Sequence, residues 1–139
     1  MAGNLTLMMI KPSAVQLGYI GPILMRINES GFRIVAMKYL HLTRLQAFEF
    51  YKIHKEQNFF ETLIQNMTAG PIVACILEKE NAVTEFRKLI GSTDPSKAEE
   101  GTLRKLYGIS LQKNGIHGSD SDENAIIESN FYFSQIERF

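Results

Sequence analysis

Short apolar runs of strand length alternate with helical patterns along this chain, although not in strict one-to-one order. Residues 5–10 form one such run, which a Lys-Pro pair ends, and residues 72–77 form another, which follows a Gly-Pro pair. Runs bounded in this way are typical of buried strands, and residues 33–42 indicate a third. Because the order is irregular, the sequence favours a small α+β sandwich with a largely antiparallel sheet over a doubly wound parallel sheet.

The helical patterns lie between and after these strands. Helices are predicted at residues 20–28, from 43 to about 54, at about 60–67, at 81–91 and from 119–122 to about 133. Thr43 and Asn81 are expected to cap two of these helices, and Gly91 is expected to end one. Residues 92–115 are the least regular stretch, with a short helical turn around Leu103 as the only expected element.

Composition places the chain among soluble globular proteins. Its 139 residues, of which 45% are apolar and 22% charged, indicate one domain that spans residues 1–139. The 15 basic and 15 acidic residues cancel, so no overall field attracts nucleic acid or a membrane. The sequence has neither a signal core nor a membrane-spanning run, and a cytoplasmic location is expected by default. The one cysteine, Cys75, is expected to be a small buried residue.

The sequence lacks the common motifs for phosphate and metal binding. It contains no Walker-type phosphate loop, no dinucleotide fingerprint and no nucleophile elbow. Three scattered histidines and one cysteine form no metal-ligand cluster. Two of these histidines, His41 and His54, are interpreted as polar residues at the end of a strand and of a helix. Positive charge for an anionic ligand must therefore be concentrated at a local site.

The densest group of polar residues is the segment 114–121, Asn-Gly-Ile-His-Gly-Ser-Asp-Ser. His117 stands beside a glycine, which leaves its imidazole open to close approach by a ligand. The Ser-Asp-Ser oxygens that follow can hold the amides of a helix N-terminus, and such a helix end favours a negative group. An imidazole that faces an anion can act as nucleophile or as acid and base. Taken alone, this pattern is more often a loop histidine with ordinary helix caps.

Positive charges elsewhere in the chain extend this hypothesis. Lys11 ends the first strand, Arg87 lies on a helix shortly before Thr93, and Arg104 lies in the irregular stretch. Each alone is typical of a solvated surface charge. With a reactive histidine they would form a phosphate clamp, because a guanidinium group pairs with two oxygens at once. The Phe-Phe pair at residues 59–60 is either plain core or a platform for a nucleobase.

Several motifs, in order along the chain, resemble those of nucleoside diphosphate kinases. The segment 114–121 is similar to the family signature N-x-x-H-G-S-D-S, which is specific, and residues 9–12, Met-Ile-Lys-Pro, resemble the first strand of the family. Further similar segments are residues 31–38, 50–60, 69–74, 80–83, 87–95 and 101–104. The resemblance covers about residues 5–133.

The resemblance implies a ferredoxin-like sandwich in which helices pack around a four-stranded antiparallel sheet. It also implies transfer of the γ-phosphoryl group of a nucleoside triphosphate to a nucleoside diphosphate by a ping-pong route, which maintains triphosphate pools. ATP, GTP and other nucleotides are the expected partners, with no specific nucleic acid. Mg²⁺ is expected on the nucleotide phosphates, without direct ligands from the protein. Family members assemble from dimers, so a homotetramer or homohexamer is expected.

The resemblance also implies roles for individual residues. His117 is the expected nucleophile, and Glu128 is the carboxylate that orients its ring. Ser119 and Tyr51 are expected to support the histidine. The expected nucleotide-binding residues are Lys11, Phe59, Leu63, Arg87, Thr93, Arg104, Leu111 and Asn114. Of these, Phe59 is expected to stack on the base with Leu63 and Leu111 nearby, and the others are expected to bind phosphates and ribose.

The sequence departs from the family pattern at a few positions. Ser13 stands where the family usually has Asp, Asn58 stands where Pro is common, and Lys105 lies in a segment that usually differs. Ser129 follows the orienting carboxylate at a position where the family tends to be apolar. None of these departures removes an expected site residue. They bear on rate and nucleotide preference rather than on the presence of activity.

Two other functions fit the same residues in part. A non-catalytic nucleotide-binding relative on this fold would lack His117 or a clamp residue, and this chain lacks none. A histidine-dependent phosphohydrolase would pass the phosphoryl group to water. Such an enzyme needs a dedicated base that activates water, and the sequence does not offer one.

Overall fold

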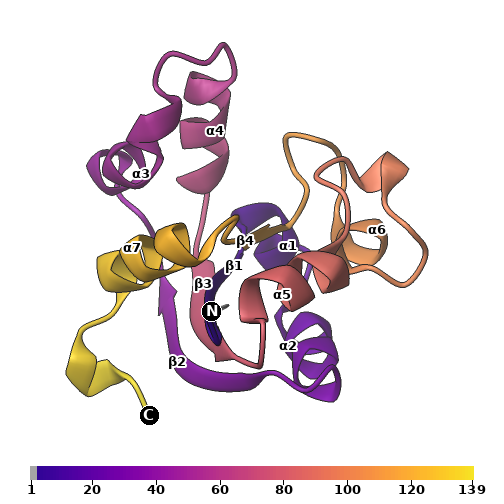
Figure 1. The fold of residues 1–139 in the computed structure, drawn as a ribbon. Helices are drawn as coiled ribbons and strands as arrows, with labels where there is room; N and C mark the ends of the chain where they lie inside the picture. The colour runs from indigo at the N-terminus through magenta and orange to yellow at the C-terminus, as the bar shows by residue number, and fades with distance from the viewer. Residues whose placement is uncertain (1–2) are drawn as a thin grey trace.

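Four strands form one antiparallel sheet in the order β2–β3–β1–β4 in the computed structural model, which describes residues 3–139 (Figure 1). They are β1 (Leu5–Ile10), β2 (Arg33–Leu40), β3 (Ile72–Glu78) and β4 (Ile116–Gly118). The two central strands are β1 and β3, and every neighbouring pair is antiparallel. This arrangement confirms the predicted α+β class and the four-stranded ferredoxin-like sheet.

Helices cover both faces of the sheet, and this explains why the central strands are continuous apolar runs. Along β1, Leu7 and Met9 belong to one core, whereas Met8 and Ile10 belong to the other, and all four side chains are fully buried. An antiparallel sheet with one solvated face would instead show alternating polarity. Cys75 of β3 lies in the second core, where burial raises the pKa of its thiol to about 12. The prediction of a small buried cysteine is confirmed.

Seven α-helices surround the sheet in the described part of the chain. They are α1 (Pro12–Gln16), α2 (Ile20–Glu29), α3 (Arg44–Tyr51), α4 (Phe60–Met67), α5 (Ala82–Ile90), α6 (Leu103–Tyr107) and α7 (Asp122–Tyr132). Single 3₁₀ turns are η1 (Lys52–His54), η2 (Pro95–Lys97) and η3 (Gln135–Glu137). Within residues 3–139, no helix combines the length and apolarity that crossing a membrane requires.

The helices divide between the two faces of the sheet. Side chains of α3, α4 and α7 join the core on the Leu7 face, and those of α1, α2, α5 and α6 join the core on the Met8 face. In Figure 1, α3 and α4 stand together at the top of the view, beyond the sheet. We refer to residues 44–67, which comprise α3, η1 and α4, as the helical arm.

Local capping explains several of the element boundaries. Thr43 caps α3 as predicted: its hydroxyl accepts a hydrogen bond from the Gln46 amide at 3.1 Å, and the Gln46 side chain accepts one from the Thr43 amide at 2.9 Å. The α-helix ends at Tyr51, and only a 3₁₀ turn continues to His54. Ser121 caps α7 by accepting a hydrogen bond from the Asn124 amide at 3.1 Å, within the predicted start region.

The prediction that the Asn81 side chain caps α5 is wrong. Asn81 has a left-handed backbone with φ of 55°, and its side chain makes no capping hydrogen bond. The chain reverses within a few residues between β3 and α5, and asparagine tolerates the left-handed conformation that this turn uses. The sequence patterns also missed α1 and β4. Pro12, which was interpreted only as the end of a strand, occupies the first turn of α1, where its missing amide hydrogen costs nothing.

Gly118 has a structural role that the sequence analysis did not foresee. A Cβ atom at this position would lie 2.9 Å from Cδ2 of Phe86 and 3.1 Å from Cδ1 of Ile90. Contacts this short would force β4 away from α5. The glycine beside His117 therefore allows the strand to lie against this helix, in addition to leaving the imidazole open.

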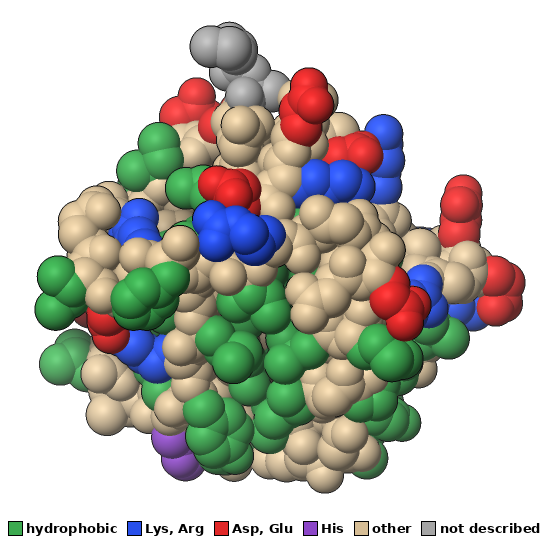
Figure 2. All heavy atoms as spheres, turned by 90° about the horizontal axis from the view of Figure 1, so that it is seen from below, with side chains coloured by type: hydrophobic (Ala, Val, Ile, Leu, Met, Phe, Trp, Pro, Cys, Tyr) green, Lys and Arg blue, Asp and Glu red, His purple; other side chains and the backbone are tan. Residues whose placement is uncertain are grey.

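The side of the molecule that carries β2 and α2 exposes apolar side chains. Figure 2 shows this side, which faces downward in Figure 1. Apolar side chains gather across its centre. Met25 of α2 and Met37 and Tyr39 of β2 are each more than half exposed. β2 is also an edge strand, although the Phe139 amide donates a hydrogen bond to its Val35 carbonyl.

Candidate active site

His117 is the middle residue of β4, directly opposite Met9 of β1. Its side chain is only 18% exposed and lies on the wall of a cavity of about 200 Å³. Tyr51 and His54 from the helical arm, Arg87 from α5 and Glu128 from α7 also line this cavity. The sheet thus fixes the imidazole, while helices from both faces close the space around it.

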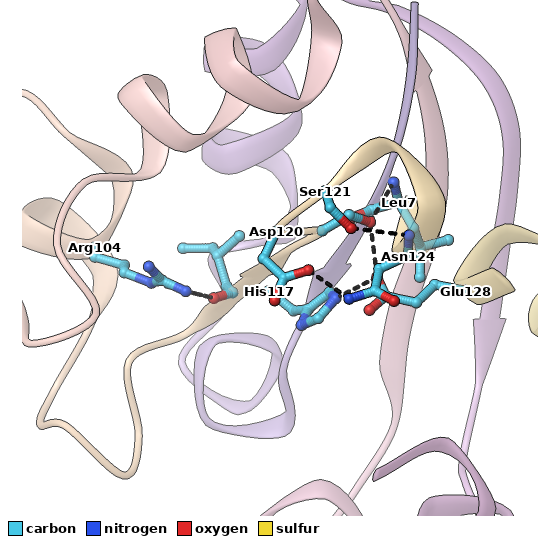
Figure 3. A network of polar contacts seen from close by, with 9 residues as sticks. Leu7, Arg104, His117, Asp120, Ser121, Asn124 and Glu128 are labelled. Carbon is cyan, nitrogen blue, oxygen red and sulfur yellow. Dashed lines mark hydrogen bonds and ion pairs between the residues drawn. The ribbon is translucent and has the colours of Figure 1, made fainter. Parts of the chain in front are cut away.

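A carboxylate holds one nitrogen of the imidazole (Figure 3). Nε2 of His117 lies 2.8 Å from Oε1 of Glu128, and the hydroxyl of Ser119 donates a hydrogen bond to the same oxygen at 2.7 Å. Because Nε2 is engaged in this way, Nδ1 is the nitrogen left for chemistry. A carboxylate in this position fixes both the orientation and the tautomer of a histidine.

Ser119 is fully buried and fastened to the central strand. The Leu7 amide donates a hydrogen bond to its hydroxyl at 3.1 Å, and the Ser119 amide donates one to the Leu7 carbonyl at 3.1 Å. The sequence had suggested that oxygens of the Ser-Asp-Ser segment hold the amides at the start of α7. The Ser119 side chain does not do so, because it is bonded to β1. Ser121 caps α7 instead, and two turns later this helix presents Glu128.

Aromatic rings pack behind the imidazole. The Phe50 ring meets that of His117 edge-on, with 5.8 Å between the ring centres. Tyr51 is buried, and its hydroxyl has no hydrogen-bond partner among residues 3–139. Burial, with smaller contributions from Tyr132 and Glu128, raises the pKa of Tyr51 well above its usual value. The Tyr51 hydroxyl therefore stays protonated.

Arg104 is a buried cation beneath the strand that carries His117. Its guanidinium donates hydrogen bonds to the Ile116 carbonyl at 2.9 and 3.3 Å (Figure 3). It also donates one to the Gly91 carbonyl at 3.0 Å. Burial and the neighbouring charge of Arg87 lower its pKa to about 10. The sequence interpretation of Arg104 alone, a solvated surface charge, is wrong, because only 7% of the residue is exposed.

Lys11 adds a second desolvated cation. It follows β1 directly, and its ammonium donates a hydrogen bond to Oδ1 of Asn114 at 3.0 Å. Burial and the charge of Arg104 lower the pKa of Lys11 to about 8. None of the ion pairs formed among residues 3–139 includes Lys11, Arg87 or Arg104. Cations that repel one another without a carboxylate partner create a positive potential that an anion would relieve.

Asn114 connects two of the expected nucleotide-binding positions. Besides accepting a hydrogen bond from Lys11, its side chain donates one to the Thr93 carbonyl at 3.1 Å. Asn114 is almost fully buried, whereas Thr93 is exposed. The structure thus brings Lys11, Thr93 and Asn114 together although they are distant in the sequence, but none of the three lines the cavity around His117.

The expected base-binding residues lie apart from the cavity around His117. Phe59 is 49% exposed at the start of α4 and packs near the His54 ring, and Leu111 is 51% exposed. Neither lines that cavity. Leu63 is partly buried and lines a second, smaller cavity of about 60 Å³ that also reaches Lys11. Phe59 and Leu111 are thus exposed to solvent, whereas Leu63 is partly buried.

The structure adds cavity residues that the sequence analysis did not assign. His54, interpreted as a polar residue at a helix end, lines the same cavity as His117, and so do Asp120 and Asn124. Asp120 accepts a hydrogen bond from the Asn124 side chain at 2.6 Å. The spacing in the sequence could have indicated this position for His54. It follows Tyr51 by three residues, and one helical turn places both side chains on the same face.

An oriented imidazole with a free nitrogen, next to cations that have no acidic partners, is suited to binding phosphate groups and attacking them. On this antiparallel sheet, the site defines a phosphate-handling enzyme. Among the described residues, no group of three or more His, Cys, Asp or Glu side chains is placed to hold a metal ion. The comparisons with known proteins specify the class further.

The family model of nucleoside diphosphate kinase matches residues 4–138. A nucleoside diphosphate kinase of Flavobacterium psychrophilum is 53% identical over 139 residues, which is the full length of both chains. The solved nucleoside diphosphate kinase of Aquifex aeolicus is 40% identical, covers 98% of this chain and 99% of its own, and superimposes with a TM-score of 0.95. The chain belongs to the nucleoside diphosphate kinase family.

A third relative is known with a ligand. The nucleoside diphosphate kinase of Halobacterium salinarum, solved in complex with CDP, is 34% identical, covers 99% of this chain and 92% of its own, and has a TM-score of 0.94. The protein is thus a nucleotide-binding transferase with nucleoside diphosphate kinase activity, EC 2.7.4.6. Enzymes of this family generally use Mg²⁺-nucleotides.

Proposed function

We propose that His117 carries the phosphoryl group from a nucleoside triphosphate to a nucleoside diphosphate in two half-reactions. The lone pair of Nδ1 attacks the γ-phosphorus, the bond to the bridging oxygen breaks, and the diphosphate leaves with that electron pair. In the second half-reaction, a terminal oxygen of another diphosphate attacks the phosphohistidine, and the nitrogen–phosphorus bond breaks. The observation that carries this proposal is the His117 Nε2–Glu128 contact, which leaves Nδ1 for attack.

The residues around the imidazole then have distinct tasks. Glu128 holds Nε2 and stabilises the positive charge that the ring gains when Nδ1 binds phosphorus. Ser119 fixes Glu128 by its hydrogen bond at 2.7 Å and is itself held by β1. Tyr51 closes the wall of the cavity next to the carboxylate. This arrangement preorganises the nucleophile, which is a large part of catalysis in phosphoryl transfer.

The cations of the site bind the phosphates. Arg87, Arg104 and Lys11 neutralise the charge that develops on the transferring group, and Thr93 and Asn114 bind the remaining phosphate and ribose oxygens. The mutual repulsion of Arg87, Arg104 and Lys11 supports this role, because a phosphate chain would replace that repulsion with attraction. His54 is positioned to add a further hydrogen-bond donor in the same cavity.

Mg²⁺ enters this scheme as part of the substrate. The residues that line the cavity include the Arg87 cation and the Asp120 side chain, in addition to the carboxylate that His117 and Ser119 occupy. Mg²⁺ in phosphate-transfer sites typically keeps several waters and relies on substrate phosphates, so this set fits an ion carried by the nucleotide. Its charge would then supplement the arginines at the phosphate chain.

The nucleobase is expected to lie against exposed apolar side chains. Phe59 would stack on one face of the base, with Leu63 and Leu111 nearby. Stacking tolerates every base because each has a π-face, so ATP, GTP and other nucleotides would all be accepted. The half-exposed position of Phe59, outside the cavity around His117, supports a lack of base preference.

The protein is further proposed to act as a single domain that maintains triphosphate pools in the cytoplasm, and to self-associate. A homotetramer or homohexamer built from dimers would cover the exposed apolar side chains on the side of β2 and α2 (Figure 2). An edge strand with exposed apolar neighbours is a surface that proteins commonly cover.

The phosphohistidine is tested by a labelled half-reaction. Incubation with γ-labelled ATP is expected to give an acid-labile, base-stable labelled protein, and GDP should then remove the label as GTP. His117→Ala should take up no label, whereas His41→Ala, at an exposed histidine outside the cavity, should label normally. Label released only as inorganic phosphate would favour a phosphohydrolase. A wild-type protein that takes up no label would overturn the covalent mechanism.

A further inference from the structure

Three buried hydroxyl groups near the orienting carboxylate have no hydrogen-bond partner among residues 3–139. They belong to Tyr51 at the end of α3 and to Ser129 and Tyr132 of α7. Buried hydroxyls in native proteins are usually paired with protein groups or with ordered water, so each exception has to be explained. Ser129 is one of the positions where the sequence departs from the apolar residues of the family.

Tyr132 lies one helical turn after Glu128, so the two side chains share a face of α7. The rings of Tyr51 and Tyr132 both pack on Phe50, with centres 4.8 and 5.2 Å from that of the Phe50 ring. Phe50 in turn meets His117 edge-on. Helices α3 and α7 thus each place a tyrosine ring against Phe50, which lines the cavity around His117.

The carboxylate is within electrostatic reach of both hydroxyls. Burial raises the pKa of Tyr132 far above its usual value, and the negative charge of Glu128 raises it further. The same charge contributes to the raised pKa of Tyr51, after burial and Tyr132. Both tyrosines therefore remain protonated and keep an O–H group that can donate to an anion.

Such donors would stabilise the negative charge of Glu128. Its Oε1 atom accepts both the His117 and the Ser119 hydrogen bonds, in a side chain that is only 18% exposed. A carboxylate in a poorly solvated site stays ionised only if enough donors stabilise its charge. The need is greatest in the free enzyme, before phosphorylation gives the imidazole its positive charge.

We propose that Tyr132 is a positioning residue for phosphoryl transfer, whose hydroxyl stabilises the ionised Glu128 carboxylate through a buried water shared with Tyr51. A buried water commonly makes about three hydrogen bonds, and the two hydroxyls with the carboxylate supply that number. This inference rests on the proposed roles of His117 and Glu128. It extends the support of the nucleophile by one residue, from a helix position that the catalytic motifs do not include.

The test is the variant Tyr132→Phe, which keeps the ring and its packing on Phe50. Its rate of His117 phosphorylation by γ-labelled ATP is expected to fall about tenfold. The apparent KM for ATP is expected to stay unchanged, because the residues proposed to bind its phosphates are untouched. Tyr19→Phe, a partly buried tyrosine in the opposite core, is the matched control and should leave the rate unchanged.

A double-mutant cycle shows whether Tyr132 acts through Glu128. Glu128→Gln removes the charge, so adding Tyr132→Phe to it should cause little further loss. A purely structural role would instead give a lower melting temperature and the same loss of rate in both backgrounds. A wild-type rate in Tyr132→Phe, or an equal loss in the Glu128→Gln background, would overturn the proposal. A wild-type rate in Glu128→Gln alone would overturn the proposed function of the carboxylate instead.

Discussion

The two halves of the candidate site are built in opposite ways. His117, Ser119, Glu128 and Arg104 are mostly or fully buried, and strands β1 and β4 with helix α7 connect them through hydrogen bonds. The helical arm, by contrast, presents Phe59 to solvent. We call the group of His117, Ser119, Glu128 and Arg104 the phosphoryl half, and the part of the arm around Phe59 the base half. The difference in burial indicates that the phosphoryl half is rigid, whereas the base half is adaptable.

The difference follows from what each half has to do. Phosphoryl transfer requires the nucleophile and cations to be placed within a fraction of an ångström, and buried networks provide such placement. Stacking on a base requires only a ring of suitable orientation. Buried side chains of the arm, such as Ala47, Ile64 and Met67, belong to the core on the Leu7 face, whereas its exposed part carries surface contacts such as the ion pair between Arg44 and Glu61. Exposed ion pairs of this kind contribute little to stability.

The largest expected effect comes from removing the buried cation. Arg104→Met should lower kcat/KM for ATP-to-GDP transfer about 100- to 1,000-fold, the range seen when one group that stabilises transition-state charge is lost. Arg44→Met removes an arginine from the helical arm and is the matched control, with less than about a twofold change expected. Steady-state kinetics of both variants measure the contrast. Equal losses in the two variants would contradict a rigid phosphoryl half.

The burial of Arg104 could not be predicted from the sequence. The residue type and the family motif indicated a phosphate ligand, but nothing in the local sequence showed that its guanidinium would be buried under the Ile116 carbonyl. Burial of a charge depends on contacts between segments, here α6 and β4. The same limit applies to Asn81, whose type suggested a cap while the turn geometry required a left-handed residue.

The elements that were predicted well have strong local patterns. The central strands and α5 follow from apolar runs and helical spacing within single segments. β4 has only three residues, one of them His117, and pairs with β1 through distant sequence, so no periodicity could reveal it. The site was predictable only through the family motif, because residues 114–121 alone suggested a loop histidine more often than a catalytic one.

Lys11 gives the next largest effect, and it depends on pH. Its pKa of about 8 in the free protein means that the ammonium is half neutral at that pH. Bound phosphates favour the charged form, so nucleotide affinity should fall by up to about tenfold per pH unit above 8, with proton uptake on binding. Calorimetry in buffers of different ionisation enthalpy measures both quantities. In Lys11→Met, both should disappear.

The same group affects stability with the opposite sign. The pKa of Lys11 is lowered in the folded protein from about 10.5, so between pH 8 and 10.5 the unfolded chain binds more protons. The contribution of Lys11 to the free energy of unfolding therefore rises with pH in this window, while nucleotide binding weakens. Denaturant unfolding of the free wild-type protein and of Lys11→Met isolates this contribution. A wild-type stability that follows that of Lys11→Met across the window would contradict it.

A smaller effect is expected from the base half. Phe59→Ala should raise the apparent KM of all nucleotides about fivefold, which corresponds to ~1 kcal/mol of stacking on an exposed ring. The maximal rate should change little, because the phosphoryl half is untouched. Phe139→Ala removes an aromatic ring that is more exposed than that of Phe59 and lies far along the chain, and it should leave KM unchanged. A loss confined to one base would show that Phe59 reads base identity rather than a π-face.

The smallest effect is expected from removing either of two helix caps that have the same chemistry. Thr43 caps α3 in the helical arm, and Ser121 caps α7, which carries Glu128; each hydroxyl accepts one backbone hydrogen bond at 3.1 Å. Replacing either residue by Ala should lower the free energy of unfolding by ~1 kcal/mol. The kinetic consequences should differ, because α7 holds the orienting carboxylate, whereas the first turn of α3 touches no expected ligand of the phosphates.

Ser121→Ala is therefore expected to lower kcat by a few-fold, and Thr43→Ala to change KM by no more than about twofold while leaving kcat intact. Hydrogen exchange should locate each loss, with faster exchange in the first turn of α3 for Thr43→Ala and in that of α7 for Ser121→Ala. If both variants lowered kcat alike, the arm and the sheet would form one cooperative unit. If only Ser121→Ala lowers it, the fixed geometry of the phosphoryl half, rather than general stability, sets the rate.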